Sequence, residues 1–135
     1  NRNGDLPQVI KADSIDLLDG KIIEEAVYSK NQGYQSIGII CKDAQESESL
    51  YSRLKDRLSL HLVHSGENLN TAGVFIITMS KGLEFDSVLI YGVNKESYHS
   101  TDDKKLLYIA STRALHRLNL FYTGEKSAFI GGISW

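Results

Sequence analysis

The residues best suited to chemistry lie in one polar segment between two apolar runs. Residues 78–86 (TMSKGLEFD) supply hydroxyls, an ammonium group, a flexible glycine and two carboxylates. The runs on either side, residues 74–77 and 88–91, are short and apolar, which is typical of buried strands. A polar loop between two interior strands is where an α/β domain usually carries its chemistry, so we place the candidate site there.

Arg113 is the second candidate, because it lies near the end of a predicted helix over residues 102–114. Composition alone leaves two interpretations open. A cation at a helix C-terminus stabilises the helix dipole, so Arg113 could be a capping residue. Alternatively, it could present its guanidinium group to a phosphate held by a neighbouring domain, which is the role of an arginine finger.

Strands and helices alternate along the chain. Apolar runs predict strands over residues 8–10, 36–41, 60–64, 74–78, 87–91 and 118–122. Apolar residues at helical spacing predict helices over residues 19–30, over 102–114, and from Asp43 along the stripe Leu50, Leu54 and Leu58. Gly33 is expected to end the first helix, and Glu46 to complete a capping box with Asp43. This order predicts an α/β fold with a mostly parallel sheet and helices on both faces.

Composition limits the class of protein. The 135 residues suffice for one domain, and the formal net charge of −2 argues against strong nucleic-acid binding by charge alone. Cys41 is the only cysteine, which excludes an internal disulfide and a multi-cysteine zinc site and fits a reducing, cytoplasmic setting. No apolar run approaches the about 20 residues of a membrane helix, so we expect no membrane partner.

Several motifs are missing from the sequence. It contains neither GxxxxGK[ST] nor GxGxxG, so the chain has no phosphate cradle of its own and should not hold a nucleotide firmly by itself. Its four histidines follow no metal-binding spacing, and we predict no metal site. The chain does not begin with methionine, so we expect it to be a piece of a longer protein.

Together, the loop and the later helix resemble a known pair of motifs. Residues 78–86 and 106–115 (LLYIASTRAL) resemble motifs V and VI of the UvrD-like superfamily of ATP-dependent DNA helicases, and residues 37–47 are similar to the motif that opens their second RecA-like domain. The resemblance covers about residues 36–122. Residues 2–7 and 94–103 look most like the DNA helicase IV subfamily, some of whose members bind RNA polymerase.

This resemblance implies a second, C-terminal RecA-like domain with a P-loop NTPase fold over residues 1–135, without its own Walker A motif. ATP and Mg²⁺ would be bound mainly by the N-terminal RecA-like domain of the same protein. Arg113 matches the motif VI arginine and would be the catalytic residue that contacts the γ-phosphate. Gly82 and Glu84 match the nucleotide-side residues of motif V, although Glu84 could instead stabilise the loop. The isolated domain is expected to be inactive.

On the nucleic-acid side, the resemblance implies that the loop contacts single-stranded DNA. Thr78 and Ser80 would bond a backbone phosphate, while Lys81 could contact phosphate or support the loop. Lys42, at the end of a predicted strand, is a further phosphate candidate. Tyr108 also matches a family position, but we expect it to lie in the core.

Three functions follow from these residues. The leading one is the second motor domain of an ATP-dependent DNA helicase or translocase. The alternative is an ATP-driven remodelling factor that binds RNA polymerase and does not unwind duplex DNA. The third is an α/β binding module with degenerate motifs, which predicts that Arg113 is held in a buried internal salt bridge.

Overall fold

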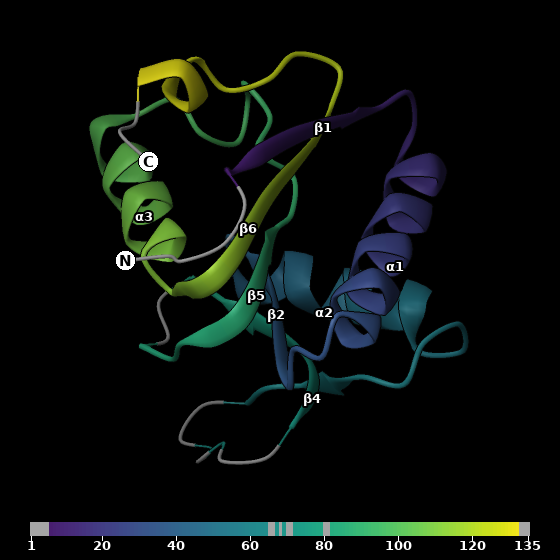
Figure 1. Ribbon diagram of the computed structural model, residues 1–135. Helices are drawn as coiled ribbons and strands as arrows, with labels where there is room; N and C mark the ends of the chain where they lie inside the picture. Colours follow the sequence, from purple (N-terminus) through teal and green to yellow (C-terminus); the bar gives the residue numbers. More distant parts are fainter. Residues whose placement is uncertain (1–5, 65–66, 68, 70–71, 80–81, 133–135) are drawn as a thin grey trace.

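A computed structural model describes residues 6–64, 67, 69, 72–79 and 82–132. One six-stranded sheet runs through the molecule in the order β1-β6-β5-β2-β4-β3, and every pair of neighbouring strands is parallel (Figure 1). The strands are β1 (Gln8–Ala12), β2 (Ser36–Cys41), β3 (His61–Leu62), β4 (Gly73–Thr78), β5 (Phe85–Ile90) and β6 (Ala114–Thr123). The helices are α1 (Ile15–Asn31), α2 (Ala44–Leu54), α3 (Thr101–Ser111) and the 3-10 helix η1 (Ala128–Gly132). The predicted α/β class is confirmed.

Helices cover both faces of the sheet, as Figure 1 shows, with α1 and α2 on one face and α3 and η1 on the other. Side chains alternate along β2, so Ile37, Ile39 and Cys41 join the core under α1 and α2, while Ile40 joins the core under α3. Strands buried on both faces need apolar side chains at successive positions, which is why the central runs of the sequence are continuous.

Gly38 in β2 has a packing role. A Cβ atom at this position would lie 2.4 Å from the Phe85 ring, so only glycine leaves room for that ring across the strand. Phe85 packs in turn on Phe75 of β4, with ring centroids 5.9 Å apart. The side chain of the first residue of β5 therefore packs over the neighbouring strands, on the face of the sheet that α3 covers.

The first helix begins four residues earlier than predicted. Ser14 is its N-cap and accepts a hydrogen bond from the backbone N–H of Leu17 at 3.1 Å, which starts α1 at Ile15. Gly33 follows the helix at φ 93°, in the left-handed conformation expected of it.

The second helix is capped by Asp43, as predicted, but the capping box is not closed. The Asp43 carboxylate accepts from the Glu46 N–H at 2.9 Å. The Glu46 carboxylate bonds the N–H of Lys42 at 3.0 Å, one residue before the cap. The prediction of a reciprocal box was therefore wrong by one residue.

The third helix is shorter than predicted, and the last strand is longer. Helix α3 ends at Ser111, and β6 begins at Ala114, where we had predicted continued helix. Ala114 pairs with Phe85 of β5, and the Phe85 N–H donates to the Arg113 carbonyl at 2.9 Å. Pairing with β5 extends this segment, so Arg113 lies in the turn between α3 and β6.

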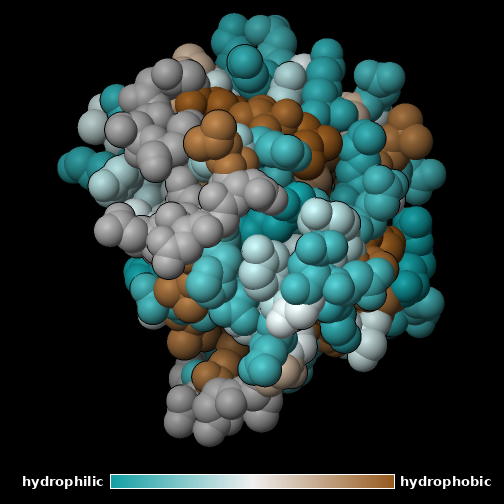
Figure 2. Space-filling model, in the orientation of Figure 1, coloured by the Kyte–Doolittle hydropathy of each residue, from teal (hydrophilic) through white to brown (hydrophobic). Residues whose placement is uncertain are grey.

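The surface is mostly hydrophilic on the side drawn in Figure 2. Apolar surface gathers in the upper part of that view, where β1 crosses in Figure 1. Val9 in β1 and Leu6, two residues before this strand, are exposed apolar side chains. None of the helices in the described part of the chain is both long and apolar enough to cross a membrane.

Candidate functional site

The loop between β4 and β5 separates the predicted site residues. Thr78 ends β4 opposite Cys41, at the carboxyl edge of the sheet. The chain then returns to the amino edge, because the Asp86 N–H bonds the Ser36 side chain at 2.9 Å at the start of β2. Gly82 and Glu84 therefore lie just before the start of β5, near the amino edge of the sheet. The predicted DNA-contact residues Ser80 and Lys81 lie outside the described residues.

At the amino edge, the Arg113 guanidinium lies beside the loop. Its Nη2 atom would lie 3.9 Å from a Cβ atom placed on Gly82, so the two residues predicted to share the nucleotide site are neighbours. The Arg113 side chain is half-buried, and its Nε atom is buried without a hydrogen-bond partner. A buried N–H without a partner is costly in a folded protein and is compensated if a ligand oxygen reaches it.

None of the described acidic residues forms an ion pair with Arg113. The binding-module interpretation predicted such a pair, and it is absent from this part of the chain. Arg113 also does not end the helix as a cap. The C-cap is Thr112, whose hydroxyl donates to the Ile109 carbonyl at 2.6 Å.

The two carboxylates of the loop have different environments. Glu84 is exposed to solvent. The Asp86 carboxylate accepts hydrogen bonds from the backbone N–H groups of Gln35 at 2.9 Å and Ser36 at 3.3 Å. Its other oxygen lies 3.8 Å from Nε2 of His116. Asp86 therefore joins the starts of β2 and β5, which leaves Glu84 as the carboxylate of this loop that is free to meet a ligand.

At the carboxyl edge, Lys42 is held by the protein itself. Its ammonium group lies 3.0 Å from Oδ1 of Asp103 and donates to the Ser97 carbonyl. It also lies 5.2 Å from the centre of the Tyr98 ring. Thr78 is half-buried at this same edge. The structure thus brings Lys42 and Thr78 to one edge and Gly82, Glu84 and Arg113 to the other.

Asp103 is the residue that sequence reasoning missed. Asp103 lies in the first turn of α3, where the helix dipole favours a carboxylate. Its carboxylate accepts from the N–H groups of His99 at 3.1 Å and Ser100 at 3.2 Å, while Ser100 caps the helix in return. Burial raises the pKa of Asp103, but these hydrogen bonds and Lys42 outweigh it and hold the pKa well below its ordinary value. The spacing of Ser100 and Asp103 was a visible capping pattern, whereas the contact with Lys42 had no local signal.

Tyr108 is not in the core, contrary to our expectation. Leu107 and Ala110 face the sheet and are fully buried, and Tyr108 follows Leu107 by one position on the helix. One position turns the side chain by about 100°, so Tyr108 points away from the sheet and is 53% exposed.

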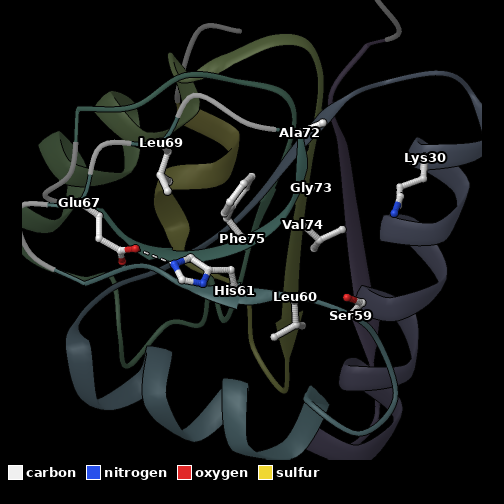
Figure 3. A pocket seen from close by; sticks show the side chains of 10 residues that line it. All are labelled: Lys30, Ser59, Leu60, His61, Glu67, Leu69, Ala72, Gly73, Val74 and Phe75. Atoms are coloured by element: carbon white, nitrogen blue, oxygen red, sulfur yellow. Dashed lines mark hydrogen bonds and ion pairs between the residues drawn. The ribbon is translucent and has the colours of Figure 1, made fainter.

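A separate hollow of about 600 Å³ opens at the amino end of β4 (Figure 3). His61 and Glu67 meet across it through a hydrogen bond of 2.7 Å. Among the predicted site residues that the structure describes, none lines it. The lining residues are Lys30, Ser59, Leu60, His61, Glu67, Leu69, Ala72, Gly73, Val74 and Phe75. Within the described ranges, no group of three or more acidic, histidine or cysteine side chains is placed to hold a metal ion.

A comparison with protein families decides the relationship. Residues 73–121 match the family described as the UvrD-like helicase C-terminal domain. Over this stretch the chain resembles UvrD-like helicase C-terminal domains. The matched stretch includes Thr78, Gly82, Glu84 and Arg113 but not Lys42, so it spans the whole amino-edge group.

Solved structures of helicases are also similar to this chain. The C-terminal domain of a possible DNA helicase from Lactobacillus plantarum WCFS1 is 28% identical, with a TM-score of 0.86 over 97% of this chain and 82% of that one. The arterivirus nonstructural protein 10 helicase, solved with DNA, is 10% identical, with a TM-score of 0.57 over 87% of this chain and 28% of that one. The same arterivirus helicase solved in another structure is 9% identical, also with a TM-score of 0.57.

The arterivirus likeness concerns the fold alone. A comparison with curated proteins gave no match. The resemblance to UvrD-like helicase C-terminal domains and the α/β architecture are therefore confirmed, whereas the DNA helicase IV subfamily and the role of each site residue stay predictions.

Proposed function

We propose that the full-length protein is an ATP-dependent DNA helicase or translocase, and that residues 1–135 are its second motor domain. The UvrD-like match and the likeness to a possible DNA helicase domain support the proposal. The observation that carries it is Arg113, whose buried Nε has no hydrogen-bond partner and whose guanidinium lies beside Gly82. An arginine so placed is available to a phosphate oxygen.

In this proposal the amino edge is half of a nucleotide site. ATP, when bound, supplies the phosphoryl group whose transfer to water drives the motor. The described residues fit the part of the site that completes ATP binding by another domain. They offer an arginine beside Gly82, and no described cluster of side chains would hold Mg²⁺. The N-terminal RecA-like domain would hold the phosphates and the metal. Arg113 would donate hydrogen bonds to the phosphoryl oxygens and stabilise negative charge there, while Glu84 would face the ribose.

The carboxyl edge is the proposed side for single-stranded DNA. The Thr78 hydroxyl, followed in the chain by Ser80 and Lys81, would bond backbone phosphates. Such contacts position a strand without reading its bases, as a translocase requires. With a net charge of −2, this domain alone should bind DNA weakly and in a salt-sensitive way.

ATP hydrolysis by the full-length protein, with and without single-stranded DNA, tests the proposal. We expect turnover that DNA stimulates, and loss of turnover in Arg113→Ala with nucleotide binding retained. Arg57→Ala, at an exposed arginine in the turn after α2, is the control and should behave as wild type. Hydrolysis that ignores DNA would favour the alternative of RNA polymerase remodelling. Wild-type turnover in Arg113→Ala would contradict the assignment of Arg113.

A further inference from the structure

Lys42 is held more completely than a surface lysine. Its side chain is 27% exposed, and its ammonium group reaches both Asp103 Oδ1 and the Ser97 carbonyl. An ammonium group has three N–H donors, so two are used inside the protein. The Tyr98 ring adds a cation–π contact with the same group.

The Asp103 carboxylate depends on this lysine. Its side chain is 10% exposed, and it accepts hydrogen bonds from the N–H groups of His99 and Ser100 as well as the contact from Lys42. A mostly buried carboxylate that loses its only ion-pair partner among the described residues is strongly destabilised where it lies. The first turn of α3 would then shift or loosen to let the carboxylate reach water.

Helix α3 connects this contact to Arg113. It spans Thr101–Ser111, so about 12 Å of helix separates Asp103 from Ser111, two residues before Arg113. Apart from Asp103, its buried residues are only Leu107, Ala110 and Ser111. Its carboxyl end is fixed where the Arg113 carbonyl accepts from Phe85 N–H at 2.9 Å. A short helix with few buried side chains depends on its two ends for its position.

We propose that Lys42 is a positioning residue: its ion pair with Asp103 fixes α3 along the sheet, and α3 in turn places the Arg113 guanidinium beside the loop at Gly82. This inference rests on the proposed role of Arg113. It assigns Lys42 to the arrangement of the nucleotide half-site at the opposite edge of the sheet, in place of the DNA contact that the sequence suggested. A displacement of about 1 Å at a catalytic group costs on the order of 100-fold in rate, so a small shift of α3 suffices.

The test is made in the full-length protein with Lys42→Met and Asp103→Asn, which remove each charge at similar side-chain size. We expect each to lower kcat without DNA by about 10- to 100-fold, with ATP affinity and DNA affinity unchanged. In an Arg113→Ala background, Lys42→Met should cause no further loss, because both changes act on the same group. Lys95→Met removes an exposed pair with Glu125 (3.5 Å) and should change nothing.

Hydrogen exchange provides a readout that does not need turnover. Lys42→Met should speed amide exchange across α3, whereas Lys95→Met should not. Unchanged exchange in α3 would overturn the inference. So would normal kcat in Lys42→Met together with weaker DNA binding and a salt slope reduced by about one, which is the result for a phosphate contact. Inactive Arg113→Ala with normal Lys42→Met overturns the inference alone, whereas active Arg113→Ala overturns the proposed function.

Discussion

Two arginines four residues apart have opposite environments. Arg117, inside β6, is buried, and its Nε and Nη2 atoms donate to the Glu25 carboxylate at 2.6 and 3.1 Å. Its guanidinium also lies 4.6 Å from the centre of the Tyr28 ring. Arg113, in the turn before β6, has no ion-pair partner among the described residues, and its buried Nε bonds to nothing.

The strand explains the difference. Arg117 points from β6 towards α1, where Glu25, Ser29 and Ser87 form a buried network: the Ser29 hydroxyl donates to Glu25 at 3.1 Å and lies 2.8 Å from the Ser87 hydroxyl. Burial of a guanidinium requires such complete pairing. Arg113 lies at the amino edge of the sheet, where the described residues give it no ion-pair partner. Arg117 therefore stabilises the fold, whereas we propose that Arg113 binds a ligand.

Arg113→Ala is expected to have the largest effect on activity and tests whether the two arginines differ in role. We expect kcat of the full-length protein to fall by about 10³-fold or more, as for loss of an arginine finger. The free energy of unfolding should change by less than about 0.5 kcal/mol, since no described ion pair is lost. ATPase assays and urea unfolding measure the two effects. A large loss of stability would mean that Arg113 is a structural residue like Arg117.

Arg117→Ala should have the opposite effect. It leaves the Glu25 carboxylate buried without its guanidinium, which typically costs about 3–5 kcal/mol of unfolding free energy. The double variant Glu25→Ala/Arg117→Ala should lose less than the sum of the two single changes. Urea unfolding gives these values, and Lys95→Ala at an exposed pair serves as the control. An additive double variant would show that the two side chains do not act together.

Gly38→Ala tests how the packing of Phe85 supports the position of Arg113. The added methyl group would lie 2.4 Å from the Phe85 ring. Phe85 is the first residue of β5, and its backbone N–H donates to the Arg113 carbonyl, so a shift of Phe85 would also move Arg113. Overpacking of this kind costs about 1–3 kcal/mol. Gly20→Ala, with no atom within 4 Å of the new methyl group, is the matched control. Equal stability of the two variants would mean that the ring moves aside freely.

The smallest expected effect is a dependence on pH at the other end of α3. Because the pKa of Asp103 is lowered in the fold, the ionised carboxylate stabilises the native state above its unfolded pKa of about 3.9. That contribution is lost as the pH falls through the folded pKa. The stability difference between wild type and Asp103→Asn should therefore be largest near neutral pH and shrink below about pH 4. A difference that grows on acidification would contradict the lowered pKa.

The sequence predicted the core of this fold because its signals are local. Continuous apolar runs at β2, β4 and β5 needed no tertiary information, and neither did the caps at Asp43 and Gly33. The end of the third helix was mispredicted because long-range pairing overrides local preference there. Residue 114 reads as helix in the sequence, yet it becomes strand because Ala114 pairs with Phe85.

The candidate site divides in the same way. The α/β class and the motif residues Thr78, Gly82, Glu84 and Arg113 could be predicted from the sequence, since residue type and spacing are enough to indicate a resemblance to a family. The contact between Gly82 and Arg113, and the distance of Thr78 from both, became visible only in the folded protein. The sequence could not show this separation, because a loop that crosses from one edge of the sheet to the other has no periodic pattern of residues. A side chain's partners, such as Asp103 for Lys42, depend on which distant segments the sheet brings together.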